Sequence, residues 1–188
     1  MKRNLRLPVA GWLGLAMIAT LAVNLAATLA EESSPDATPS LVEPCRTVAE
    51  ARARAQLLHE SFHATLRIVH RRYYREDEGL KIPSATLDEV FAALEPRCDV
   101  RLHWLVVNAE AMNVDHAPRD QFEKDAVAAL AAGQPEFEQS SHGVYRHAGP
   151  IVLTSECLKC HLPDRKSTDD RLAGLVISMP LGHDARDK

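Results

Sequence analysis

The 188-residue sequence lacks several features that would place it in a large class of proteins. Beyond the N-terminal region no hydrophobic run reaches membrane-spanning length, and no unit recurs with a period of about 20–50 residues. The carboxylates and hydroxyls form no recognisable catalytic constellation. Acidic residues outnumber basic ones, 26 to 22, which gives a net charge of −4. Without an excess of basic residues, nucleic-acid binding is not expected.

Cysteine is also scarce, with four residues in the whole chain. Cys45 and Cys98 lie far apart, and neither belongs to a C-x-x-C pair. A four-cysteine zinc site is therefore excluded. In an oxidising compartment Cys45 and Cys98 can form a disulfide or stay free, and the sequence leaves both alternatives open.

The other two cysteines belong to the segment Cys157-Leu158-Lys159-Cys160-His161, a C-x-x-C-H haem-attachment motif. Two thiols one turn apart can add to the two vinyl groups of one haem as thioethers. The adjacent His161 then supplies the proximal imidazole ligand of the iron. The motif occurs once, so the sequence predicts one covalent haem c per chain, held by Cys157, Cys160 and His161.

Residues 1–30 are expected to be an export signal or an uncleaved membrane anchor. Three basic residues precede an apolar run over residues 7–30, and small residues stand at its end. The run is longer than the roughly 7–15 apolar residues of most signal peptides, so a membrane tether is the alternative. We expect residues 31–44 to form a flexible tether and residues 45–188 to form a single haem domain. We expect this domain in the periplasm or another extracytoplasmic space.

The hydrophobic periodicity of the remaining chain indicates an α+β fold. Helices are expected over residues 45–75, from Ser84 or Thr86 through Leu94 with an end at Pro96, and over 119–132. Strands are expected over residues 100–107, 136–139, 144–153 and 173–180.

Four segments in this order carry a family resemblance: Gly143-Val144-Tyr145-Arg146, Gly149-Pro150-Ile151, the C-L-x-C-H motif and Ala173-Gly174-Leu175-Val176-Ile177-Ser178. They resemble a family of single-haem, c-type PAS-like domains, over roughly residues 45–182. Its members are free exported haem proteins or sensor domains of histidine kinases and chemoreceptors. The resemblance implies a PAS-like antiparallel sheet with a long N-terminal helix and the haem held near the C-terminal motif. It implies a sensory or electron-transfer role.

The second axial ligand of the iron is expected on the long N-terminal helix. His63 and His70 are seven residues apart, which places them on nearly the same face beside an apolar stripe. We predict His70 as the distal ligand, because Tyr73 and Tyr74 adjoin it, and His63 as the second choice.

Other ligands are alternatives to this pair. Met112 could ligate the iron, and the resemblance adds Cys45, since some family members are thought to use an N-terminal cysteine. A zinc pair at His59 and His63 has no third ligand in view.

Arg146 and His147, just upstream of the motif, are candidate partners of the haem propionates. We expect no enzyme, although Arg67 or Arg71 beside a histidine could support weak peroxidase activity. No kinase, receptor or DNA-binding segment follows the haem domain in this sequence. We therefore expect an electron carrier that docks a redox partner protein, with a haem-based redox or gas sensor acting through a separate partner as the alternative.

Overall fold

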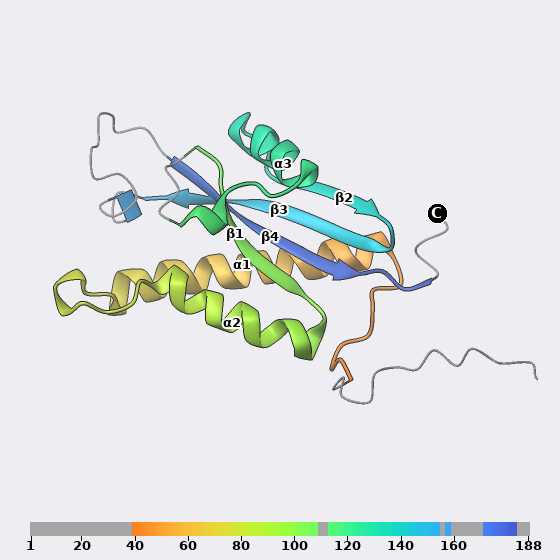
Figure 1. Ribbon diagram of the computed structural model, residues 1–188, viewed down its shortest axis with the longest axis horizontal. Helices are drawn as coiled ribbons and strands as arrows, with labels where there is room; N and C mark the ends of the chain where they lie inside the picture. Colours follow the sequence, from red (N-terminus) through yellow and green to blue (C-terminus); the bar gives the residue numbers. More distant parts are fainter. Residues whose placement is uncertain (1–38, 109–112, 155–156, 159–170, 184–188) are drawn as a thin grey trace, which may run out of the picture. The chain divides into compact units, whose positions relative to one another are not determined.

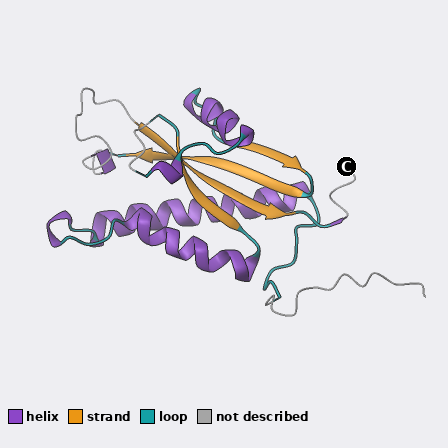
Figure 2. Cartoon of the chain, in the orientation of Figure 1, coloured by secondary structure: helices purple, strands orange, loops and turns teal. Residues whose placement is uncertain are grey.

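Three α-helices and a four-stranded antiparallel sheet form the part of the chain that the structure describes (Figures 1 and 2). This computed structural model describes residues 39–108, 113–154, 157–158 and 171–183. The helices are α1 (Val48–Tyr73), α2 (Pro83–Cys98) and α3 (Gln121–Ala131), with short 3-10 turns η1 (Glu76–Glu78) and η2 (Val114–His116). The strands are β1 (Arg101–Val106), β2 (Phe137–Ser141), β3 (Val144–Leu153) and β4 (Arg171–Pro180).

The sheet has the strand order β1-β4-β3-β2, and every neighbouring pair is antiparallel. β2 and β3 form a hairpin that turns at His142 and Gly143, with φ angles of 51° and 73°. Two successive residues with positive φ match the right-handed twist of a two-residue hairpin. β3 and β4 pair over their full ten residues, so the end of β3 lies beside the start of β4.

Helices cover both faces of the sheet, with α1 and α2 on one face and α3 on the other (Figure 1). Alternate strand residues point to opposite faces. Tyr145 and Ile151 of β3 therefore join the cluster under α1 and α2, whereas Ala148 joins the smaller cluster under α3. The two faces have separate hydrophobic cores, and the larger core lies under α1 and α2.

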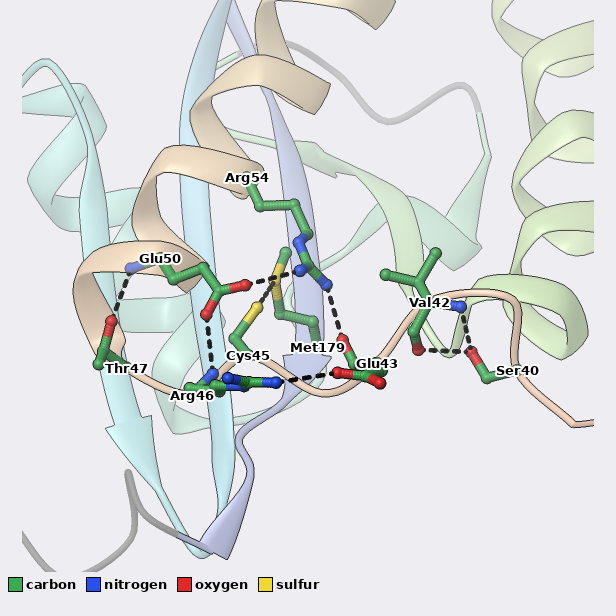
Figure 3. Close-up of polar contacts among 9 residues, drawn as sticks. All are labelled: Ser40, Val42, Glu43, Cys45, Arg46, Thr47, Glu50, Arg54 and Met179. Carbon is green, nitrogen blue, oxygen red and sulfur yellow. Dashed lines mark hydrogen bonds and ion pairs between the residues drawn. The ribbon is translucent and has the colours of Figure 1, made fainter.

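The 26-residue helix α1 begins at an N-cap threonine. Thr47 Oγ1 accepts a hydrogen bond from the backbone N–H of Glu50 at 3.1 Å, and Glu50 Oε2 accepts one from the N–H of Arg46 at 2.9 Å (Figure 3). Both bonds satisfy N–H groups that have no partner within a helix. The start of α1 is thereby fixed by side chains that adjoin Cys45.

The expected succession of helices and strands is confirmed, with one helix longer than predicted. The second helix was expected to end at Pro96, but α2 runs from Pro83 to Cys98. Pro83 occupies the first turn, where its missing N–H removes no helical bond. The helix ends at Asp99, which has a φ of 51° and donates its N–H to the carbonyl of Glu95 at 2.9 Å.

None of the helices in the described ranges has the length and hydropathy that a membrane crossing requires. The leader over residues 1–30, and residues 31–38 of the tether, lie outside these ranges.

Candidate functional site

A pocket opens where α1, the start of α2 and the end of β3 meet. The space in the pocket that a water-sized sphere can enter is small, about 70 Å³, and it opens to solvent. Most of its wall is aliphatic, with Leu66 from α1, Ile82 and Pro83 from the start of α2, and Ile151 and Leu153 from β3. Such a hollow, apolar and with few polar groups, is the usual form of a cofactor site.

Helix α1 contributes the polar side of the pocket through His63, Arg67 and His70. These residues stand at i, i+4 and i+7, so they share one face of the helix. The ring of His70 packs against Tyr74, with the ring centroids 5.2 Å apart. Tyr73, in contrast, is 69% exposed.

Burial lowers the pKa of His63 below its usual value, and the neighbouring His59 and Arg67 lower it further, whereas Glu60 acts in the opposite direction. The imidazole of His63 is therefore neutral at pH 7 and has a free electron pair on one nitrogen. A neutral imidazole is the form that ligates a metal.

Cys157 reaches the same pocket from the turn that follows β3. The carbonyl of Thr154 accepts hydrogen bonds from the N–H groups of Cys157 at 2.9 Å and Leu158 at 3.1 Å. The side chain of Leu158 is 3% exposed and packs into the larger core, which anchors the turn. Cys160, His161 and Met112 lie outside the described residues.

The structure thus brings Cys157, His63 and His70, three of the haem-binding candidates named from the sequence, to one pocket. A second hollow, of about 390 Å³, continues along α1 and α2 and shares Leu66 and Pro83 with the first. Tyr73 and Leu80 line this second hollow. The free space beside the histidines is therefore larger than the first pocket alone.

Arg146 does not reach the pocket, contrary to the sequence-based expectation. It lies on the α3 face of β3, one residue out of phase with Tyr145 and Ile151. Its guanidinium donates to Asp120 Oδ2 at 2.5 Å and to Glu123 Oε1 at 3.0 Å, and it stacks 4.2 Å from the ring centroid of Phe122. Because successive strand residues face opposite ways, this pairing directs Arg146 away from the pocket.

His147 lies on the α1 face but is enclosed in the core between β3 and α1. Its ring centroid is 5.9 Å from that of His59, and His59 in turn lies 5.8 Å from His63. A Cβ added to Gly149 would stand 2.5 Å from Nε2 of His59, so the missing side chain of Gly149 is what lets the helix approach. Among the described residues no group of three or more His, Cys, Asp or Glu could hold a metal ion.

Cys45 lies at the other end of α1, under the first turn of the helix (Figure 3). Its thiol is fully buried, 3.6 Å from Sδ of Met179, and burial raises its pKa. His63 lies about 22 Å along the helix axis from Val48, the first residue of α1, at a rise of 1.5 Å per residue. Cys45 is thereby separated from the pocket, and both Cys45 and Cys98 are free thiols, so they form no disulfide with each other.

Two contributors to the pocket were not among the predicted site residues: Arg67 as a binding group, and the Ile82-Pro83-Ser84 start of α2. The role of Arg67 could have been predicted from the sequence, because Arg67 stands one helical turn from both His63 and His70. The place of the start of α2 could not have been predicted from the sequence, since only the packing of α1 against α2 brings it to the site.

The comparisons with known proteins agree with this architecture. Residues 45–174 match the family described as Tll0287-like. The crystal structure of the cyanobacterial heme-protein Tll0287 is similar with a TM-score of 0.51 and 14% sequence identity, covering 70% of this chain and 95% of that chain. At this identity the similarity shows the fold alone. No curated protein matches the sequence. Since the family match spans well over half of its residues, the chain belongs to the Tll0287-like family.

Proposed function

We propose that this chain is an exported, single-haem c-type cytochrome with a PAS-like haem domain. Cys157 and Cys160 attach the haem, and His161 is the proximal ligand of its iron. The observation that carries the proposal is that Cys157 opens onto the same pocket as His63 and His70. The related fold of a protein described as a heme-protein adds support.

The described residues of the pocket fit a haem. An apolar wall from three elements suits the flat macrocycle, and Arg67 supplies a cation for its carboxylates. The first hollow adjoins a second one of about 390 Å³, and both share Leu66 and Pro83, so a large planar group would meet a continuous apolar surface along α1 and α2. The pKa of His63, lowered by burial, keeps one imidazole in its ligating form.

When bound, the haem supplies reversible one-electron exchange at its iron. In this proposal the side chains of the pocket hold and shield it. His70 is the distal ligand, because its ring is oriented by Tyr74, and His63 is the alternative. Leu66, Ile151 and Leu153 keep water from the site.

Electron transfer is the role that this arrangement favours. His63 and His70 line the pocket from α1, and either imidazole would hold the iron of a bound haem and so shield it from other molecules. The protein is then a carrier for a separate redox partner protein, without enzymatic activity beyond weak peroxidation. It acts in the periplasm or an equivalent space, free or tethered through residues 7–30, and does not bind nucleic acid.

A haem-based redox or gas sensor is the second candidate, and one observation favours it. Both candidate distal histidines belong to α1, a single helix of 26 residues. Release of the distal ligand would then act on one rigid element and could be read by a membrane partner.

The attachment is tested by expressing the full chain with a haem-maturation system. The wild-type protein is expected to keep its haem on a denaturing gel and after acid–acetone extraction. The variant C157A/C160A is expected to lose it. If the haem of the wild-type protein passes into acid–acetone, the c-type assignment is wrong.

The distal ligand and the role are tested by spectra of the reduced protein with and without carbon monoxide. A low-spin spectrum that the gas leaves unchanged supports the carrier, whereas rapid formation of the carbonyl form supports the sensor. His70→Ala is expected to open the iron to the gas. His142→Asn, in the exposed β2–β3 turn, is the matched control and should behave as wild type. If neither His70→Ala nor His63→Ala changes the spin state, both residues are excluded as ligands.

A further inference from the structure

Arg67 is the one side chain with a permanent charge among the described residues that line the pocket. It stands on the pocket face of α1, four residues after His63 and three before His70. The other polar members of the wall from α2 and β3 are Ser84 and Thr154, both uncharged.

The guanidinium of Arg67 has no anionic partner among the described residues, and its charge acts only on the nearby His63, whose pKa it lowers. No hydrogen bond or ion pair joins it to another described residue. By contrast, Arg52 pairs with Glu138, Arg54 with Glu50, and Arg146 with Asp120 and Glu123. An arginine that borders an apolar pocket without a carboxylate partner is poised for an anion that the pocket receives.

We propose that Arg67 binds a carboxylate of the pocket's ligand, which in a haem is a propionate. This inference rests on the proposed function and assigns the propionate subsite that Arg146 cannot provide. Arg67 is exposed at the mouth of the pocket, whereas Leu66, Ile151 and Leu153 form the apolar interior. An amphiphilic ligand therefore turns its carboxylates toward Arg67, because no other described residue of the pocket wall carries a permanent positive charge.

Two other described cations in this region, Lys81 and Arg72, are less suited to this task. Lys81 is paired with Glu89 at 2.5 Å, on the rim of the second hollow. Arg72 is exposed and lines neither hollow. A guanidinium also matches a carboxylate with two parallel N–H···O bonds, which a lysine ammonium cannot do.

The test compares the haem-loaded wild-type protein with the variants R67Q, R67K and R72Q by potentiometric titration over pH 5–9. Reduction adds negative charge at the iron, so removal of a nearby cation disfavours it. R67Q is therefore expected to have a lower midpoint potential. Arg67 holds the propionate ionised, so in R67Q the pH transition of the potential is expected to move to higher pH.

The controls separate this role from a general effect of charge. R67K keeps the cation and should stay near wild type in the pH transition, with a smaller shift of the potential than R67Q. R72Q removes the same charge from the same helix outside the pocket, and should change neither quantity measurably. The ionisable groups beside Arg67 in the pocket, His63 and His70, are unchanged in all three variants.

Two results would overturn the proposal while leaving the haem function intact. One is an equal effect of R67Q and R72Q at full haem content. The other is a midpoint potential that depends on pH in R67Q as it does in the wild-type protein, combined with a slower reaction of R67Q with peroxide. That combination would assign Arg67 to the iron and not to a propionate. A wild-type protein without covalent haem would instead remove the proposed function and this inference with it.

Discussion

At the scale of single residues, Gly149 decides how closely α1 approaches the sheet. The ring of His59 lies in the space that a side chain at residue 149 would take, with Nε2 at 2.5 Å from an added Cβ. His59 is 7% exposed and cannot swing out freely. Since α1 carries both candidate distal ligands, the geometry of the pocket depends on this contact.

We expect Gly149→Ala to lower the free energy of unfolding by about 1–3 kcal/mol, the usual effect of overpacking. The measurement is urea unfolding followed by circular dichroism. Gly182→Ala is the control, because its Cβ would make an ordinary contact of 3.5 Å with the carbonyl of Cys45. The double variant H59A/G149A should be less destabilised by the alanine at residue 149 than the wild-type background is. Equal effects in both backgrounds would contradict the steric explanation.

At the scale of secondary-structure elements, α3 is tied to the sheet by a buried ion cluster. Glu123 of α3 is 2% exposed and lies 3.0 Å from both Arg146 of β3 and His103 of β1. Its other carboxylate oxygen accepts the N–H of Arg119 at 2.7 Å. One carboxylate therefore joins the helix to two strands.

Glu123→Ala is expected to destabilise the fold by about 1–3 kcal/mol, since Arg146 keeps Asp120 as a partner but loses its buried one. Lys124→Ala, on the exposed side of the same helix, should change stability by less than about 0.5 kcal/mol. Thermal unfolding of both variants measures the difference. Similar melting temperatures for the two would show that the cluster adds little to stability.

The N-terminus of α1 offers a milder test at the same scale. Thr47→Ala removes the acceptor of the Glu50 N–H and should cost about 1 kcal/mol in unfolding free energy (Figure 3). Ser61→Ala is the matched control within α1, because the Ser61 hydroxyl only bonds back to the carbonyl of Leu57. This control should be neutral or slightly stabilising. A Thr47→Ala protein as stable as the control would argue against the cap.

At the scale of the whole molecule, buried histidines make the fold sensitive to mild acid. Burial lowers the pKa of His147, and His59 adds to this, while Glu136 and Glu138 oppose it. Burial likewise lowers the pKa of His103 against the opposing effect of Glu123. Both histidines are therefore neutral in the folded protein at a pH where the unfolded chain already binds protons.

The free energy of unfolding is accordingly expected to fall as the pH drops below about 6.5, because the unfolded state takes up more protons than the folded state. Urea unfolding between pH 5 and 8 measures this, in a window above the titration of most carboxylates. His147→Gln should flatten the pH dependence, whereas His142→Asn at the exposed hairpin turn should keep it. A protein that becomes more stable between pH 7 and 5.5 would contradict the assignment.

The sequence alone is enough to predict the succession of helices and strands and to place His63 and His70 on one face of a helix. These follow from local periodicity and from chemistry within a few residues. It also determined the haem-attachment motif, whose Cys160 and His161 lie outside the described residues.

The tertiary structure decided which groups meet. The sequence shows that successive side chains of β3 alternate between the two faces of the sheet. Only the packing of α1 and α3 on opposite faces decides that Arg146 pairs with Glu123 and that His147 is buried in the core. In the same way, the start of α2 reaches the pocket and Cys45 lies at the far end of α1 because of contacts between segments distant in sequence. Such contacts depend on how whole faces fit together, and no local pattern of residues encodes that fit.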